Sequence, residues 1–253
     1  MVDRHNKILD ILKVKKEISV QYLSSELDIS AVTIRKDLKI LEQKKLLFRN
    51  HGGATITQPY VNDRPVNIKE SINYKEKIAI ANEAVKIIDN DQYIIIASGT
   101  TVTYFAHKIN PINKITIVTS ALNVASELLN KEHVEILQLG GYVRHSSNSV
   151  IGHYSELILK ETACSKLFMG ADGIDIDYGL STSNAQEAHL NQQMMESSKE
   201  VIVLADSSKF GKRSFGRICG LDMVDHIITD ENISQKIVDK ITAMGIKITI
   251  SKL

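Results

Sequence analysis

IIIASGTT, residues 94–101, is an apolar run that ends abruptly in small and hydroxyl-bearing residues. Three consecutive isoleucines without polar alternation are typical of a strand that is buried on both faces. The change at Ser98-Gly99-Thr100-Thr101 predicts that this strand breaks into a loop and then a helix. Backbone N–H groups and hydroxyls at the start of a helix suit a phosphate dianion. The stretch therefore indicates an α/β fold with a phosphate site, and the phosphate can belong to a cofactor, a substrate or a signal.

Similar apolar runs recur from about residue 71 to the end of the sequence. Between most of them lie segments with helical spacing, such as SALNVASELL and NAQEAHLNQQMMESS. Short apolar strands that alternate with helices favour a Rossmann-like, mostly parallel sheet with helices on both faces. The expected strands are residues 93–97, 115–119, 134–139, 166–170, 200–205, 226–229 and 246–250.

The first 57 residues follow a different pattern, which predicts three helices and a hairpin. Apolar residues recur at helical spacing, Ser19 and Ser30 are suitable N-caps, and Gly52-Gly53 suits a turn between two short extended runs. The next stretch, QPYVNDRPVNIKES, contains two of the three prolines and little apolar patterning. That composition is typical of a linker.

Charge is distributed unevenly between the two parts. Residues 1–58 contain 11 Lys and Arg against 7 Asp and Glu, whereas the remaining residues contain 20 against 23. A basic end on a near-neutral body favours contact with a polyanion at that end. The second and third helices, with a short turn between them and a basic outer face on the third, form a helix-turn-helix, and the glycine hairpin would be its wing.

Contacts with DNA follow from the chemistry of the exposed side chains. In the major groove Arg35 can reach a guanine edge, and Lys36 or Lys39 can reach a phosphate. Hydroxyls near the start of the third helix and side chains of the wing can contact the DNA backbone. The same periodicity also fits a small helical bundle whose charged face is merely solvated. The candidate DNA-binding residues are Ser30, Thr33, Arg35, Lys36, Lys39, Arg49 and His51.

The stretch DISAVTIRKDLKILEQKKLLFRNHGGA, residues 28–54, resembles the N-terminal signature of the DeoR family of bacterial transcriptional regulators. That signature has a serine, a Thr-Ile-Arg-Arg-Asp-Leu core and an Arg-x-His-Gly-Gly-Ala wing. Lys36 replaces the commoner second arginine, which keeps the charge but not the bidentate geometry, and Lys45 stands near the family's usual glycine. We therefore expect a winged helix-turn-helix at residues 1–57, a linker at 58–70 and an effector domain at 71–253.

The resemblance continues through the second part, whose counterpart in the family is similar in fold to ribose-5-phosphate isomerase. LGGYVRHSSNSVIG, MGADGID, GLSTSNAQEA and ADSSKFGK follow in the family's order. Ala97 stands where an acidic residue is common, and Ser120-Ala121 departs from the family's Thr-Asn-Ser stretch. The resemblance implies a phosphorylated sugar as the effector. GLSTSNAQEAHLNQQM is similar to the branch that controls amino-sugar and hexitol catabolism.

Residue chemistry suggests how such an effector would be held. Glycines at 140–141 allow close approach of the backbone, and carboxylates after a strand, as in ADGID, can accept bonds from sugar hydroxyls. Lys209 can pair with a phosphate. Turn formation and surface solvation are alternative roles for the same side chains. The candidate effector-binding residues are Ser98, Gly99, Thr100, Thr101, Ser120, Gly140, Gly141, Arg144, Asp172, Asp175 and Lys209.

Two other functions compete with regulation by a bound ligand. An active sugar-phosphate isomerase with an appended DNA-binding module is one, since Asp172, Asp175 and Lys209 are of the types that proton transfer and enediolate stabilisation need. A DNA-binding architectural protein without a ligand is the other. Because a helix-turn-helix fused to a pocket needs only binding, we expect a non-enzymatic repressor of a carbohydrate-catabolism operon. It would act on operator DNA as a homo-oligomer, a dimer or tetramer.

Several classes of protein are disfavoured by missing patterns. GxGxxG and GxxxxGK[ST] are absent, so no dinucleotide or P-loop cofactor is expected. Cys164 and Cys219 lie far apart without a CxxC pair, which indicates reduced thiols and no metal site. Without a long apolar run or a signal peptide, the expected location is the cytoplasm, with no membrane partner. The terminal Ser251 to Leu253, SKL, is expected to trail off the last strand rather than to act as an address.

Overall fold

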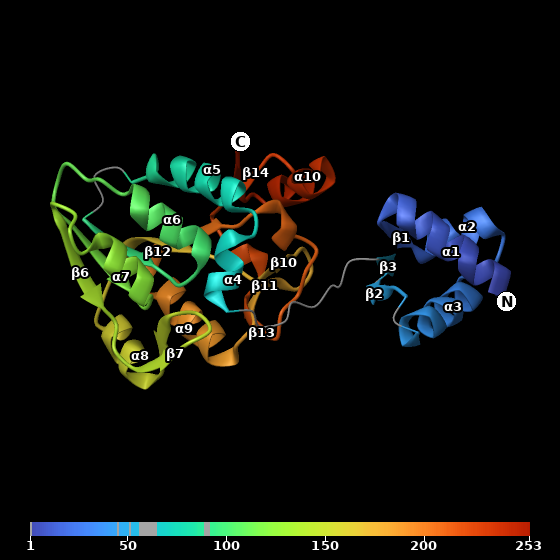
Figure 1. Cartoon of the computed structure of the whole chain (residues 1–253), viewed down its shortest axis with the longest axis horizontal. Coiled ribbons are helices and arrows are strands. Elements are labelled where there is room, and N and C mark those ends of the chain that lie inside the picture. Colours follow the sequence, from blue (N-terminus) through green and yellow to red (C-terminus); the bar gives the residue numbers. More distant parts are fainter. Residues whose placement is uncertain (1, 45, 51, 56–64, 89–91) are drawn as a thin grey trace. The chain divides into compact units, whose positions relative to one another are not determined.

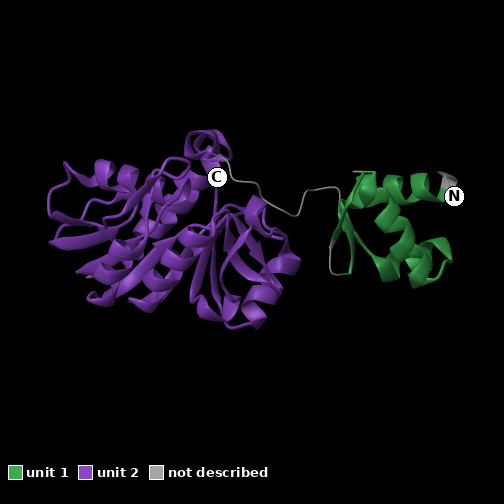
Figure 2. Cartoon of the chain, turned by 90° about the horizontal axis from the view of Figure 1, so that it is seen from below, with its two compact units in different colours: residues 1–60 green, residues 61–253 purple. Residues whose placement is uncertain are grey.

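The computed structural model of the chain consists of two compact units, residues 1–60 and 61–253 (Figure 2). The structure describes residues 2–44, 46–50, 52–55, 65–88 and 92–253. Unit 1 contains three helices and a small sheet, and unit 2 is built on a parallel sheet with helices (Figure 1). The predicted fold class, a winged helix-turn-helix followed by an α/β domain, is therefore confirmed.

In unit 1, a third strand completes the predicted hairpin. The strand order is β1-β3-β2, and β1 was not expected from the sequence. Its pairing with β3 brings Ile18 so close to Gly53 that a Cβ atom there would lie 1.8 Å from the Ile18 carbonyl oxygen. A residue with a side chain therefore does not fit at Gly53. The elements of unit 1 are α1 (Val2–Lys15), β1 (Glu17–Ser19), α2 (Val20–Leu27), α3 (Ala31–Gln43), β2 (Phe48–Asn50) and β3 (Gly53–Thr55).

Both predicted helix caps in unit 1 are present. The Ser19 hydroxyl oxygen accepts the Tyr22 N–H at 3.0 Å, and that of Ser30 accepts the Thr33 N–H at 3.3 Å. Each cap satisfies one of the backbone donors that the first turn of a helix leaves free. The apolar faces of the three helices meet in one core, which includes Ile8, Leu12, Leu23, Ile34, Leu38 and Leu41.

A buried carboxylate ties α3 to α1. Asp37 is 2% exposed and accepts hydrogen bonds from Arg4 Nε at 2.6 Å and Nη2 at 2.8 Å. Its Oδ1 also lies 3.2 Å from His5 Nε2. Burial acts to raise the pKa of Asp37, but the hydrogen bonds from Arg4 and His5 outweigh it and hold this pKa below its usual value. The ion pair thus fixes how α3 is seated in unit 1.

We expect Asp37→Ala to destabilise unit 1, because the substitution removes the hydrogen bonds that join α3 to Arg4 and His5 of α1. The melting temperature of unit 1, followed by circular dichroism of the full chain, should fall by at least ~5 °C. The matched control is Asp10→Ala, which removes an acid on α1 whose side chain is 70% exposed. Equal melting temperatures for the two variants would contradict this role of Asp37.

The central sheet of unit 2 contains seven strands in the order β15-β14-β12-β9-β4-β5-β6, and every neighbouring pair is parallel. All seven predicted strands are present, with ends shifted by at most two residues. They are β4 (Tyr93–Ile96), β5 (Ile115–Thr119), β6 (Val134–Gln138), β9 (Cys164–Met169), β12 (Ser198–Leu204), β14 (His226–Asp230) and β15 (Lys247–Ser251).

Alternate residues of a strand enter two different cores. Ile94 and Ile96 of β4 pack with α5, α6 and α7, whereas Ile95 and the following Ala97 pack on the other face with α8 and α9. All four residues are at most 1% exposed. Burial on both faces explains why the run is continuously apolar. The helices of unit 2 are α4 (Val66–Ser71), α5 (Tyr74–Val85), α6 (Thr100–Lys108), α7 (Leu122–Leu128), α8 (His153–Lys160), α9 (Ala185–Glu196) and α10 (Gln235–Ala243).

The direction of chain growth across the sheet reverses between β4 and β9. From β4 the chain adds β5 and then β6 on one side, and from β9 it adds β12, β14 and β15 on the other. The connections that follow β4 and β9 therefore leave the sheet in opposite directions. In open parallel sheets, a crevice forms at the carboxyl ends of the strands at such a point.

Several short elements of unit 2 were not expected. Five strands of three or four residues form a hairpin, β7 with β8, and a small antiparallel sheet, β10-β11-β13. Helix α4 begins inside the segment expected as a linker, residues 58–70, and ends one residue beyond it. It starts directly after Pro65, whose φ of −53° is compatible with a helix start. Residues 56–64 lie outside the described part. The short strands are β7 (Tyr142–Arg144), β8 (Ser149–Ile151), β10 (Gly173–Asp175), β11 (Gly179–Thr182) and β13 (Gly216–Cys219).

Among the residues that the structure describes, no helix has both the length and the apolar character that crossing a membrane requires.

Candidate functional site

The outer face of α3 carries the cations that the sequence assigned to DNA. Arg35, Lys36 and Lys39 are exposed, while Ile34 and Leu38 on the opposite side are buried. Within the described residues, none of the three cations forms an ion pair. Three uncompensated positive charges on one helix face suit a polyanion.

The remaining DNA-binding candidates have partners in the protein or lie outside the description. The hydroxyls of Ser30 and Thr33 lie 3.0 Å apart at the start of α3. Arg49 on β2 pairs with Glu42 at 3.4 Å, and its backbone N–H donates to the same carboxylate at 2.9 Å. His51 lies outside the described residues. The Arg49 contact holds the wing strand against the end of α3.

A cavity in unit 2 opens at the point where the strand order reverses. It follows the carboxyl ends of β4, β9 and β12 and has a volume of about 640 Å³, including the space open to solvent. Its charged lining residues are two lysines and two carboxylates. The residues that line it are Val66, Lys69, Ser98, Gly99, Thr100, Thr101, Ser146, Ser147, Gly170, Ala171, Asp172, Thr182, Glu187, Asn191, Leu204, Ala205 and Lys209.

The predicted loop Ser98 to Thr101 forms one wall of this cavity. Gly99 has a φ of +141°, a backbone conformation that favours glycine, and α6 begins at the next residue. The first hydrogen bond of α6 runs from the Thr103 N–H to the Gly99 carbonyl, so the N–H groups before Thr103 have no intrahelical partner. N–H groups without an intrahelical partner and two threonine hydroxyls at the positive end of a helix are groups that suit an anion.

Asp172 also lines the cavity and follows β9, the strand next to β4. It accepts hydrogen bonds from Lys69 Nζ at 2.7 Å, the Ser183 N–H at 3.0 Å and Thr182 Oγ1 at 3.2 Å. Burial acts to raise the pKa of Asp172, but the charge and hydrogen bond of Lys69 outweigh it and hold this pKa below its usual value. Asp172 is therefore an ionised acceptor on the cavity wall.

Lys209, at the end of the short 3-10 helix Ser207–Lys209, is a second cation of the cavity. Its ammonium has no ion-pair partner among the described residues, in contrast to that of Lys69. The helix is capped by Asp206, whose side chain accepts the Ser208 N–H at 3.1 Å. The backbone that carries Lys209 is therefore held by this cap, and the ammonium group can pair with an anionic ligand.

Six of the eleven predicted effector-binding residues line the cavity, and five do not. Ser120 is 2% exposed, and its carbonyl accepts the Val150 N–H. Asp175 pairs with Arg213 at 2.8 Å and also accepts two N–H groups of the turn that follows it. Arg144 lies 3.5 Å from Glu187, which itself lines the cavity. The turn at 140–141 leads into β7, where the Gly140 carbonyl accepts the hydroxyl of Ser155.

Six cavity residues with charged or polar side chains were missed in the sequence: Lys69, Ser146, Ser147, Thr182, Glu187 and Asn191. Lys69 lies in the expected linker, while Ser146 lies in the turn between β7 and β8. Glu187 and Asn191 stand four residues apart on α9, and so share one face of that helix. The stretches RHSSNS and SNAQEA belong to motifs that resemble the family, but without a fold they do not indicate which of their residues face a ligand.

Comparisons with known proteins agree with this architecture. The family model described as "DeoR-like helix-turn-helix domain" matches residues 4–59, and "DeoR C terminal sensor domain" matches residues 72–231. The chain therefore belongs to the DeoR family of transcriptional regulators, which confirms the resemblance found in the sequence. Unit 1 is its helix-turn-helix DNA-binding domain and unit 2 its sensor domain.

Relatives match this chain over almost its whole length. It is 35% identical to an uncharacterized HTH-type transcriptional regulator, YulB, of Bacillus subtilis, with 98% of this chain and 96% of the relative covered. It is 35% identical to the putative aga operon transcriptional repressor of Escherichia coli O157:H7, with 98% and 93% covered. The glycerol-3-phosphate regulon repressor of E. coli K12 is 31% identical, with 90% of each chain covered.

Among solved structures, ribose 5-phosphate isomerase A of Methanocaldococcus jannaschii is similar to this chain with a TM-score of 0.41 and 17% identity. The match covers 55% of each chain.

Proposed function

We propose that the chain represses a carbohydrate-catabolism operon and that a phosphorylated sugar in the cavity of unit 2 controls its binding to operator DNA. The observation that carries the proposal is the pairing of an anion site with sugar-binding groups in one cavity. The start of α6 and Lys209 provide for a phosphate, and Asp172, Glu187 and Asn191 provide acceptors and an amide for hydroxyl or amino groups. Two relatives are named for repression of the aga operon and of the glycerol-3-phosphate regulon, which supports the class of operon.

The DNA-binding half of the proposal rests on α3. In this proposal Arg35 reads a guanine edge and Lys36 and Lys39 contact phosphates. Further contacts to the DNA backbone would come from Ser30, Thr33, Arg49 and His51. One unit of this size makes few phosphate contacts, so tight binding calls for two units on adjacent half-sites. We therefore propose a homo-oligomer, a dimer or tetramer.

We further propose that the cavity binds its sugar phosphate without converting it. Proton transfer between carbon atoms needs a carboxylate that is free to exchange a proton. Asp172 is held as an anion by three donors, and Glu187, the other carboxylate of the cavity, lies 3.5 Å from Arg144. Asp175 lies outside the cavity in an ion pair with Arg213. Isomerisation of a sugar phosphate at enzyme-like rates by the purified chain would contradict this and favour the isomerase alternative.

Thr100→Val tests the phosphate site, because it removes one hydroxyl at the start of α6 and keeps the side-chain volume. In a thermal-shift screen of sugar phosphates, we expect wild type to be stabilised by at least one compound and Thr100→Val to lose most of that shift. Affinity for DNA without ligand should be unchanged. The matched control is Thr242→Val on α10, which is exposed and far from the cavity in sequence. A full shift in Thr100→Val would show that the phosphate binds elsewhere.

Arg35→Ala tests the DNA contact. On a duplex selected by wild type from a random pool, we expect the Kd to rise about 10- to 100-fold, while the Kd for random DNA changes by about tenfold or less. Electrophoretic mobility shift assays at two salt concentrations measure the Kd for the selected duplex and the Kd for random DNA. Lys7→Ala, at an exposed cation on α1, is the control and should behave as wild type. If Arg35→Ala retained full sequence preference, Arg35 would not be a base-reading residue.

A further inference from the structure

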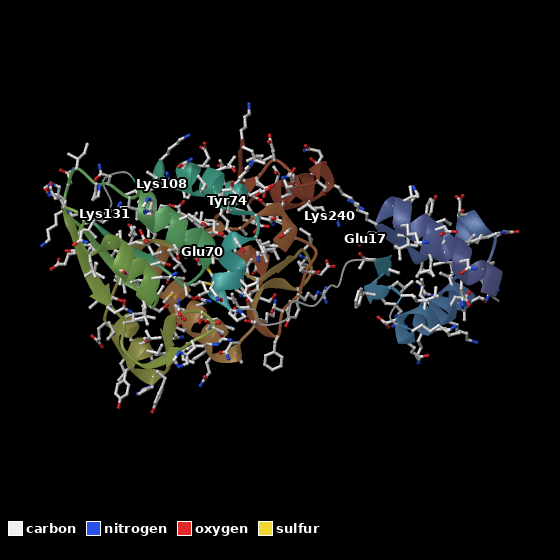
Figure 3. All side chains as sticks on the ribbon, in the orientation of Figure 1. Glu17, Glu70, Tyr74, Lys108, Lys131 and Lys240 are labelled. Atoms are coloured by element: carbon white, nitrogen blue, oxygen red, sulfur yellow. The ribbon has the colours of Figure 1, made fainter. Side chains whose placement is uncertain are left out.

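Helix α4 forms part of the cavity wall, although it belongs to the segment between the two predicted domains. Val66 and Lys69 both line the cavity. The Val66 N–H donates to the Ser146 carbonyl at 2.7 Å, which joins the start of α4 to the turn between β7 and β8. Glu70 and Tyr74, labelled in Figure 3, mark α4 and the start of α5, and both are exposed. Lys69, which precedes Glu70 on α4, is half-buried and lines the cavity.

The C-terminal end of α4 is held by a buried lysine. Lys77 of α5 is 3% exposed and donates hydrogen bonds to the carbonyls of Lys69 and Ile72, the latter at 2.6 Å. Burial lowers the pKa of Lys77 to about 8. Asn73, between the helices, donates to Asp206 at 2.9 Å and Ser208 at 3.2 Å, on the segment that carries Lys209. The backbone around Lys69 is therefore fixed to the same loop as the second cation.

The formal charges of the residues that line the cavity indicate that an anionic ligand would need the positive charge of Lys69. The formal charges of the lining residues cancel, because Lys69 and Lys209 stand against Asp172 and Glu187. A phosphate dianion would add two negative charges to a cavity that has no net positive charge. An ammonium has three donors, so Lys69 can bind a phosphate oxygen while it stays near Asp172. Asp172 keeps two other donors, the Ser183 N–H and the Thr182 hydroxyl, if Lys69 turns toward the ligand.

We propose that Lys69 is a ligand-binding residue, and that through it α4 closes on the phosphorylated ligand and reports occupancy of the cavity. This inference rests on the proposed function. Helix α4 is the first element that the structure describes after residues 56–64, the segment that leads from unit 1. A ligand that bridges the start of α6 and Lys69 adds a constraint to α4 that the empty cavity lacks. Ligand binding would thereby restrain α4, the helix that follows the segment leading from the DNA-binding unit.

The test compares Lys69→Gln, which removes the charge, with Lys69→Arg, which retains it, in the full chain. The probes are ribose 5-phosphate, glucosamine 6-phosphate and glycerol 3-phosphate, with inorganic phosphate as the minimal anion. Calorimetry gives the Kd, and hydrogen–deuterium exchange reports on the amides of residues 66–72. The matched control is Lys75→Gln, an exposed lysine on α5. Circular dichroism establishes that each variant is folded.

For the probe that binds wild type, we expect exchange at residues 66–72 to slow by about tenfold, as an added contact to α4 requires. Lys69→Gln should raise the Kd by about 10- to 100-fold, the range of a lost charged hydrogen bond, and at saturation should show no slowing at α4. Lys69→Arg should retain both effects in part, and Lys75→Gln should match wild type.

Two outcomes would overturn the proposal in different ways. If Lys69→Gln binds the probe and protects α4 as wild type does, Lys69 is not the ligand contact, although the proposed function stands. If none of the probes binds wild type at millimolar concentration, the proposed function itself fails, and this inference fails with it.

Discussion

The reversal of strand order between β4 and β9 is the constraint on which the sensing unit depends. Because β5 and β6 extend the sheet on one side and β12, β14 and β15 on the other, the connections after β4 and β9 diverge. The cavity follows from this topology, and the start of α6, Asp172 and the loop with Lys209 all meet there because each follows one of three adjacent strands.

The parts that sequence could predict are those governed by local rules. The seven strands of the central sheet are short segments rich in apolar residues. Ser19, Ser30 and the loop at 98–101 stand where caps and helix starts require such residues. Strands of three or four residues, as in β10, are too short to show a period. Glycine at 53 was predicted as a turn residue, but its second role, close contact with β1, depends on a strand 35 positions away in sequence.

Charged side chains were the least predictable, because their partners are distant in sequence. Asp172 pairs with Lys69, 103 residues earlier, and this brought a residue of the expected linker into the site. Asp175 was expected to bind a ligand, but its carboxylate accepts a hydrogen bond from Arg213, 38 residues later. In unit 1, Asp37 belongs to the family signature, yet nothing local indicated that Arg4 and His5 would bury its charge. Sequence identified the chemistry of these groups, whereas the fold decides which of them remain available.

The central claim is that a phosphorylated sugar in the unit 2 cavity changes the affinity of the chain for its operator. A ligand can shift a two-state equilibrium only by its difference in affinity for the two states. The most direct measurement is fluorescence anisotropy of an operator duplex titrated with the full chain, with and without the sugar phosphate that stabilises it. The account predicts a change in the Kd for DNA of at least ~10-fold, within the usual range of allosteric coupling. An unchanged Kd at saturating ligand would contradict it.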